Sequence, residues 1–553
     1  MARRRPSRWL ALPFALIALG AAAPIAPASA TSGPRITAPV RVTSGDTVPT
    51  RTYSSPALAV DPEDDQTVVA SYAEMRTASC GMARSRDGGR TWARLRTPVS
   101  PPSHPFCFVP LGSNVYFSPV AFGRDHALYV ALAGWDVQDG RTSSVLLARS
   151  TDLGDSWSIT VVRDARGKPE PEAEMNRPVA SLAVDRTGPA DVVYVGWVMS
   201  QPNARPPRPS ASLVATSTDG GRTFSPPVSA VGTTFDDPAA RQAALALRPT
   251  VLPPGAPAPQ PVEAITADRF GGGYTQVVLG ARGTVYVLWV PAVSGTPTLW
   301  SLYVSRSTDQ GRTFTATQAV PPGFALRSPV LAWAPAGGPE GTLHLVYEQK
   351  TPPAGGDRDV VYQRSSDGGR TWSEPRTIND DDPKLLTLQF MPNITVAPSG
   401  RVDIAWWDFR NDTGAFQNDV YLSSSLDGGA TWSPNIRVTD RSINRKIGPW
   451  SNGYDVRQSP GLAATAAYTI VGWDDTRNGD PDAQAQDIYG AFVQFKDLPA
   501  TTSRALVYGL AAVVGLAVAG VAVSVVALAR RQRPSAAPSA HAPAPSPESA
   551  EMR

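Results

Sequence analysis

The sequence predicts an all-β protein, a β-propeller of seven four-stranded blades, and three observations lead to this prediction. One eight-residue motif occurs six times with constant spacing, and seven pairs of apolar strands alternate with it. The two ends of this repeating region also resemble complementary parts of one blade. Four strands per repeat of roughly 60 to 90 residues is the pattern of a propeller with variable loops.

The repeated motif has the form Ser-x-Asp-x-Gly-x-Thr/Ser-aromatic. Its copies are Ser85–Trp92, Ser150–Trp157, Ser217–Phe224, Ser307–Phe314, Ser365–Trp372 and Ser425–Trp432. Each copy lies between two extended stretches and therefore predicts a hairpin turn. The glycine supplies the positive φ that a tight turn needs, and the Ser and Asp side chains accept hydrogen bonds from the turn amides. We interpret six aspartates as structural: Asp87, Asp152, Asp219, Asp309, Asp367 and Asp427.

The strand pairs between these turns are rich in Val, Ile, Tyr and Trp, as β-strands require. They are Pro56–Tyr72, Pro119–Leu132, Pro178–Trp197, Tyr274–Trp289, Pro329–Tyr347, Pro392–Trp407 and Pro460–Trp473. The first six pairs continue into a third strand, the turn motif and a fourth strand. The seventh pair has only a third strand, at 487–495.

The missing strand of the seventh repeat is predicted to come from the N-terminal part of the chain. Residues 35–43 resemble the fourth strand of the sixth repeat, 435–439. If this first strand completes the last blade, the ring closes and no sheet edge is left open. A six-bladed ring with one irregular blade is the alternative.

Both ends of the chain predict membrane targeting. Residues 1–30 combine a basic stretch, an apolar stretch and a small-residue cleavage site, as in a signal peptide. Residues 505–529 are apolar and uncharged, and such a stretch of about 25 residues is long enough to cross a bilayer. Arginines follow at once, which places the end of the chain in the cytoplasm.

The predicted organisation is therefore a propeller ectodomain at 31–498, a linker at 499–504, one transmembrane helix at 505–529 and a disordered cytoplasmic tail at 530–553. We expect a single-pass type I protein of the cell membrane with its propeller outside the cytoplasm. The excess of Arg over Lys, together with many Ala and Pro residues, suggests a high-GC bacterial gene.

Charge, cysteines and histidines limit the partners. A formal net charge of +3 shows no footprint of nucleic-acid binding. Cys80 and Cys107 fit one disulfide bond of an exported protein, with two independent thiols as the alternative. The four histidines lack metal-ligand spacing, so no cofactor is predicted. The acidic stretches 380–382 and 474–482 fit either solvated loops or a Ca²⁺ site.

The candidate site lies at the ends of the second strands. The innermost strand of a propeller blade runs from the top face downward, which puts the repeated turns on the bottom face and the loops after the second strands on the top. Polar and aromatic residues gather there: Glu74, Arg76, Asp136, Glu348, Trp407, Asp408, Arg410, Trp473, Asp474 and Arg477.

The sixth and seventh repeats share a motif at this point, Trp-Asp, one or two further residues, then Arg-Asn. Carboxylates and guanidiniums at the mouth of a funnel suit a polar ligand, either anionic or rich in hydroxyls. In a second interpretation each Asp pairs with its own Arg and only fixes the turn. The tryptophans likewise fit either packing between blades or stacking against sugars.

The repeated motif resembles the Asp-box, or BNR repeat, of bacterial sialidases and related propellers, over about residues 35–496. The resemblance implies three arginines that bind the substrate carboxylate, an acid/base Asp, and a Tyr nucleophile activated by a Glu, an exception among glycosidases. Arg76, Arg410 and Arg477 supply three arginines, and the catalytic candidates are Asp408, Asp474, Glu348 and Tyr454. The Arg-Ile-Pro motif of sialidases is broken at 35–39.

The leading hypothesis is recognition of a cell-surface glycan or protein ligand at the top face of a membrane-anchored propeller. An exo-α-sialidase type of glycoside hydrolase is the first alternative. A non-catalytic assembly scaffold is the second.

Overall fold

The computed structural model describes one part of the chain. The described residues are 34–45, 51–75, 79–98, 108–109, 114–115, 119–135, 143–164, 175–200, 211–230, 271–292, 299–324, 327–350, 358–384, 387–414, 416–448, 459–479 and 485–495. All of them belong to the first of two compact units, Met1–Lys496. The predicted signal peptide, linker, transmembrane helix and tail lie outside the described residues. Within the described part, no helix is long and apolar enough to cross a bilayer.

The first four blades are antiparallel sheets of four consecutive strands. Blade 1 is β3 (Tyr53–Asp61), β4 (Asp64–Glu74), β5 (Ser79–Ser85) and β6 (Ala93–Arg94); blade 2 is β9 (Val120–Phe122), β10 (Leu128–Trp135), β11 (Ser143–Ser150) and β12 (Ser158–Arg163); blade 3 is β13 (Met175–Asp185), β14 (Val192–Ser200), β15 (Ala211–Ser217) and β16 (Val228–Ser229); blade 4 is β17 (Gly271–Leu279), β18 (Val285–Ala292), β19 (Leu299–Ser307) and β20 (Thr315–Phe324).

The last three blades follow the same order, and the seventh takes its outer strands from the start of the chain. Blade 5 is β21 (Arg327–Ala334), β22 (Thr342–Lys350), β23 (Arg358–Ser365) and β24 (Arg376–Thr377); blade 6 is β25 (Gln389–Val396), β26 (Val402–Asp408), β27 (Gln417–Ser425) and β28 (Ile436–Arg437), with β29 (Ile443–Asn444) added on β27; blade 7 is β30 (Gly461–Ala464), β31 (Tyr468–Asp475) and β32 (Asp487–Gln494), with β1 (Arg35–Ile36) and β2 (Val40–Arg41). The short strands β7 (Phe108–Val109) and β8 (Asn114–Val115) pair outside the blades, and a 3-10 turn, η4 (Ala281–Gly283), joins β17 to β18.

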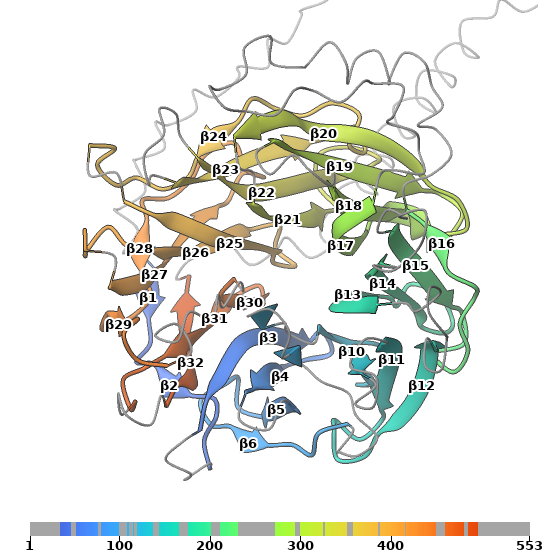
Figure 1. Ribbon diagram of the computed structural model, residues 1–553, viewed down its shortest axis with the longest axis horizontal. Coiled ribbons are helices and arrows are strands. Elements are labelled where there is room, and N and C mark those ends of the chain that lie inside the picture. The colour runs from blue at the N-terminus through green and yellow to red at the C-terminus, as the bar shows by residue number, and fades with distance from the viewer. Residues whose placement is uncertain are drawn as a thin grey trace, which may run out of the picture. The chain divides into compact units, whose positions relative to one another are not determined.

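The seven blades form a closed ring. The innermost strands contact one another in the order β3, β9, β13, β17, β21, β25 and β30, and β30 contacts β3 again (Figure 1). The prediction of a seven-bladed, four-stranded propeller is confirmed, and the six-bladed alternative is wrong. Antiparallel neighbours within each blade put the loops between first and second strands on the same face as the repeated turns.

The N-terminal strands close the ring, as predicted. Arg35 pairs with Gln494 and Val40 pairs with Gly490, so β1 and β2 lie along β32. The likeness to the fourth strand of blade 6 extends to side chains. Arg41 lies 2.9 Å from the carboxylate of Asp487 in blade 7, as Arg437 lies 2.8 Å from that of Asp419 in blade 6.

The six repeated turns share one hydrogen-bond pattern, which explains their fixed spacing. In the fifth copy Ser365 Oγ donates to Asp367 Oδ1 at 2.8 Å, and Thr371 Oγ1 donates to Asp367 Oδ2 at 2.6 Å. Gly369 N–H donates to the serine hydroxyl at 2.9 Å, with φ +88° at the glycine. In the second copy, hydrogen bonds from Ser156 and Ser150 lower the pKa of Asp152 to about 2.

The hydrophobic core lies between neighbouring blades. Its largest fully buried side chains are tryptophans, Trp197, Trp289, Trp406, Trp407 and Trp473. Trp407 and Trp473 belong to one cluster that blades 6 and 7 share. Both rings therefore take part in packing between blades, and a sugar cannot stack on them without opening this core.

Candidate functional site

The polar ends of the second strands in blades 6 and 7 are built identically. Trp406 Nε1 donates to Asp408 Oδ2 at 2.8 Å, and Trp473 Nε1 donates to Asp475 Oδ2 at 2.7 Å. The backbone N–H of Arg410 and that of Arg477 donate to the same aspartates, each at 2.8 Å. The shared motif is therefore Trp-x-Asp-x-Arg-Asn.

The sequence-based prediction matched these two strand ends, called the corners of blades 6 and 7 below, one residue out of register. Asp474 corresponds to Trp407, and the partner of Arg477 is Asp475. Successive side chains of a strand point to opposite faces, so this shift moves the carboxylate to the other side of the sheet. The sequence allowed either match. Trp406-Trp407-Asp408 contains two tryptophans, and Trp473-Asp474-Asp475 contains two aspartates.

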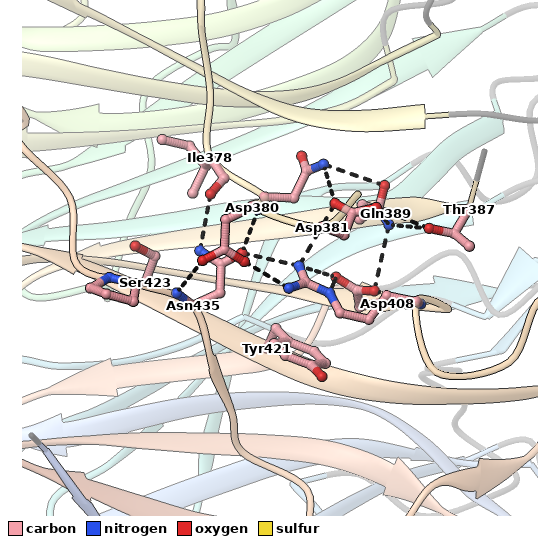
Figure 2. A network of polar contacts seen from close by, with 12 residues as sticks. Ile378, Asp380, Asp381, Thr387, Gln389, Asp408, Tyr421, Ser423 and Asn435 are labelled. Carbon is pink, nitrogen blue, oxygen red and sulfur yellow. Dashed lines mark hydrogen bonds and ion pairs between the residues drawn. The ribbon is translucent and has the colours of Figure 1, made fainter. Parts of the chain in front are cut away.

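Arg410 donates hydrogen bonds to three acceptor side chains, Asp408, Asp380 and Asn435, which are labelled in Figure 2. Its guanidinium donates to Asp408 at 2.8 Å, to Asp380 at 2.7 Å and to Asn435 at 3.0 Å. It also lies over the ring of Tyr421, 4.1 Å from the centroid. Burial opposes the charged form, but the carboxylates of Asp408 and Asp380 outweigh it and raise the pKa of Arg410.

Arg477 occupies the equivalent place in blade 7. It contacts Asp475 and Asp440, each at 2.7 Å, and its guanidinium lies 4.3 Å from the centroid of Tyr489. Asp380 and Asp440 both follow the fourth strand of the preceding blade. Each arginine therefore links the end of the second strand of its own blade to the preceding blade. Arg410 and Arg477 share no carboxylate partner, and the geometry favours the interpretation in which Asp and Arg fix the turn.

Asp474 and Glu348 have a different role, since each accepts hydrogen bonds from the innermost strand of the next blade. Asp474 accepts from Ser55 N–H at 3.0 Å and from Ser54 Oγ at 2.7 Å. Glu348 accepts from Met391 N–H at 3.0 Å. Ser55 and Met391 have φ values of +60° and +49°. A non-glycine residue in this region costs roughly 1–3 kcal/mol, and the carboxylates stabilise it.

Asp474 is buried, and burial raises its pKa to about 6. The positive charge of Arg445 opposes this shift, and burial lowers the pKa of Arg445 to about 10. Arg445 Nε donates to Asn418 Oδ1 at 2.7 Å, and its guanidinium lies 4.6 Å from the centroid of Trp407. This buried polar layer lies just beneath the top face of blades 6 and 7.

Two carboxylates that sequence reasoning missed organise the outer part of the same corners. Asp419 accepts hydrogen bonds from Arg437, Thr439 and Asn411. Asp487 accepts from Arg41, Arg51, Thr43 and Asn478. A signal was present, because the similar triplets Asp419-Val420-Tyr421 and Asp487-Ile488-Tyr489 lie in the first half of the third strands of blades 6 and 7.

An exposed aromatic ring lies above this layer and was not predicted either. Phe416 is 52% exposed and directly precedes β27. Lys446 Nζ lies 4.0 Å from the centroid of its ring. Asp412 fixes the loop by accepting hydrogen bonds from the backbone N–H groups of Gly414, Phe416 and Gln417. Phe416 is thus an exposed apolar surface on an ordered, charged rim.

The structure describes only some of the remaining candidates. Arg76, Asp136, Tyr454 and Cys107 lie outside the described residues. Glu74 is buried at the end of β4, and Cys80 is disulfide-bonded. Among the described residues, no group of three or more His, Cys, Asp or Glu side chains is arranged to hold a metal ion. Asp380 and Asp381 contact Arg410, at 2.7 and 3.9 Å.

One family model matches part of the chain. Residues 275–451 match the family model of the BNR repeat-like domain. The match spans residues of blades 4 to 6 and agrees with the resemblance of the repeated turns to the Asp-box, or BNR repeat. A search of curated proteins finds no match to the sequence.

Solved structures with a similar fold include carbohydrate-active enzymes. The Fusarium graminearum GH93 α-L-arabinofuranosidase with arabinobiose is 12% identical, with a TM-score of 0.42. The match covers 70% of this chain and 98% of the arabinofuranosidase chain. The Hadza microbial sialidase Hz136 is 13% identical, with a TM-score of 0.40 and coverage of 84% and 96%. Trypanosoma rangeli sialidase with sialic acid is 13% identical, with a TM-score of 0.40 and coverage of 72% and 55%. No residue role is transferred from them.

Proposed function

We propose that this BNR-repeat propeller is a recognition module, held at the cell membrane by residues 505–529, that binds a surface glycan at the top face of blades 6 and 7. The observation that carries the proposal is Phe416, an exposed ring on a loop that Asp412 holds in place. An aromatic surface beside a few fixed polar groups is a common design for binding a sugar, because it offers an apolar face and hydrogen bonds together.

Charged side chains are accessible to a glycan on the same face. Lys446 lies beside it, and the side chains of Asp380 and Asp440 are 48% and 43% exposed. The Asp380–Arg410 and Asp440–Arg477 pairs join neighbouring blades. Asp408 and Asp475 hold the same two arginines within their own blades, which keeps the surface rigid. A rigid surface loses little conformational entropy when a ligand binds, which favours affinity.

Hydrolysis of the sialidase type is the rival function. Clamping a substrate carboxylate requires guanidiniums directed at one ligand. Arg410 and Arg477 instead donate to separate sets of carboxylates within the fold. Recognition without turnover therefore has the stronger support among the residues that the structure describes.

A glycan array tests the proposal. The full-length chain in a mild detergent is applied with and without Ca²⁺, and a fluorogenic sialoside is assayed in parallel. We expect binding of a glycan class without turnover. Phe416→Ala should lose this binding at an unchanged midpoint of thermal unfolding. Leu426→Ala is the matched control, since it removes an apolar side chain that is 65% exposed in the Asp-box turn of the same blade.

Three outcomes would contradict the proposal. Turnover of the sialoside would favour the hydrolase. Undiminished binding by Phe416→Ala would move the site elsewhere. Absence of any bound glycan would favour a protein partner or the scaffold role.

A further inference from the structure

A cavity lies on the face of the ring opposite the proposed glycan surface. The hairpin loops that join first and second strands in blades 1 to 5 enclose an open pocket of about 490 Å³. This is the face that carries the Asp-box turns. Its lining includes Glu63, Arg124, Arg186, Arg282 and Trp333. The volume lies within the range of about 300–1,000 Å³ that small-molecule sites occupy.

Positive charge exceeds negative charge in this pocket. Three successive blades contribute Arg124, Arg186 and Arg282, against the two carboxylates of Glu63 and Asp185, a formal balance of three minus two. Asp185 already accepts hydrogen bonds from the backbone N–H and hydroxyl of Thr187, at 2.8 and 2.6 Å. Glu63 is 3.4 Å from Arg186, and both side chains are about one-third exposed. Such a pair is weak and a ligand can displace it.

Two pocket side chains are held in place before any ligand arrives. Arg124 Nη1 donates to the carbonyl oxygens of Arg186 and Gly188, at 3.0 and 3.1 Å. Trp333 Nε1 donates to the carbonyl oxygen of Glu340 at 2.9 Å. An ordered guanidinium and an ordered indole ring thus border the same opening. Pre-organisation of this kind reduces the entropy cost of binding.

The side chain of Arg282 is available to a ligand. Among the described residues its side chain is exposed and takes part in no hydrogen bond or ion pair. It lies at the tip of its hairpin with φ +55° and ψ +40°. Glycine adopts this conformation without strain, whereas arginine does not. The positive φ values of Arg282 and Gly283 are those of a two-residue hairpin turn, closed by the hydrogen bond from Thr284 N–H to the carbonyl oxygen of Ala281 at 3.0 Å. A glycine would fit the position of Arg282 without strain, so the turn itself does not require the guanidinium.

We propose that this pocket binds a small organic oxyanion, a carboxylated or phosphorylated sugar, whose acidic group is held by Arg282 and Arg186 and whose ring contacts Trp333. Guanidinium groups pair with carboxylates and phosphates through two parallel hydrogen bonds, which gives such a site both affinity and selectivity. This site is separate from the proposed glycan surface on the top face and does not depend on it.

Calorimetric titration of the full-length chain in detergent tests the proposal. Glucuronate and glucose 6-phosphate are the acidic probes, and glucose at the same ionic strength is the neutral control. At least one acid should bind ten times more tightly than glucose, and raising the salt concentration should weaken it. Binding of one acid alone identifies the preferred acidic group.

Two variants distinguish a site from a structural feature. Arg282→Gly removes the guanidinium and relieves the strained φ, so it should weaken acid binding at least tenfold while the midpoint of thermal unfolding stays equal or rises. Arg312→Ala is the matched control, because Arg312 is an exposed Asp-box arginine outside the pocket lining. It should bind the acid as the wild type does. The proposal is overturned if neither acid binds better than glucose, or if Arg282→Gly binds as tightly as the wild type.

Discussion

Thr43 and Asp487 are 444 residues apart in the sequence, yet Thr43 Oγ1 donates a hydrogen bond to Asp487 Oδ1 at 2.9 Å. The same carboxylate contacts Arg41 at 2.9 Å and Arg51 at 3.1 Å. One buried aspartate therefore joins the first strands of the chain to the last one. The closure of the propeller rests on a polar cluster as well as on backbone pairing.

Asp487→Asn should destabilise the propeller strongly. The substitution leaves Arg41 and Arg51 without their charged partner, and breaking such a buried ion pair costs about 3 kcal/mol or more. Urea denaturation measures the change in unfolding free energy. Glu340→Gln is the control, because it removes a partly exposed partner of Arg306 at 2.8 Å. It should cost less than about 1 kcal/mol, and equal costs for both variants would contradict the role of Asp487.

Asp475→Ala and Asp440→Ala should differ although both remove a partner of Arg477. Asp475 is buried, whereas the side chain of Asp440 is 43% exposed. We expect Asp475→Ala to lower the unfolding free energy by about 3 kcal/mol. Asp440→Ala should lower it by less than about 1 kcal/mol, because water screens that pair. Similar losses in a denaturation series would show that burial does not decide the strength of these pairs.

Asp474→Asn should change how stability depends on pH. Burial raises the pKa of Asp474 from 3.8 to about 6, so the folded chain keeps a proton that the unfolded chain has released. Stability therefore falls as pH rises from about 4 to 6. The asparagine variant lacks this loss, and its unfolding free energy relative to the wild type should increase over that interval. A pH-independent difference between the two proteins would contradict the shift.

His126 should stabilise the junction of blades 1 and 2 in acid only. Its Nδ1 lies 2.6 Å from Asp61 Oδ2, and the hydrogen bond and charge of Asp61 raise the pKa of His126 above 6.5. The stabilisation is fully present below pH 6.5 and disappears as pH rises through the raised pKa. His126→Asn keeps a residue that tolerates the local φ of +59°. It should lower the unfolding midpoint at pH 5.5 and have little effect at pH 9, and the reverse order would refute the pairing.

The architecture was predictable because it depends on local, repeated chemistry. Each Asp-box contains its own donors and acceptors, as Ser365, Asp367 and Thr371 show, so six copies identify six blades from sequence alone. The strand 35–43 ends in the same Arg-Val-Thr as its counterpart 435–439, which indicated where it pairs. The seven-bladed ring followed from these two facts.

The candidate site was less predictable because its contacts cross between blades. Nothing local joins Arg410 to Asp380, and only strand register separates Asp475 from Asp474 as the partner of Arg477. The exposure of Phe416 depends on the Asp412 loop, and the bottom-face pocket combines loops from five blades. Composition and motif spacing contain no information about contacts between residues of different blades.

The pairing of β1 and β2 with β32 also sets an order of events during synthesis. A ribosome makes the N-terminal strand first and its partner last, so residues 35–41 must wait until 487–494 have emerged. During that interval the waiting strand can pair with the same edge of a second, nascent copy, which yields an interlocked dimer by strand exchange. Expression at a high concentration of nascent chains should thus favour strand-exchanged dimers. Expression of the same sequence at a low concentration should favour closed monomers.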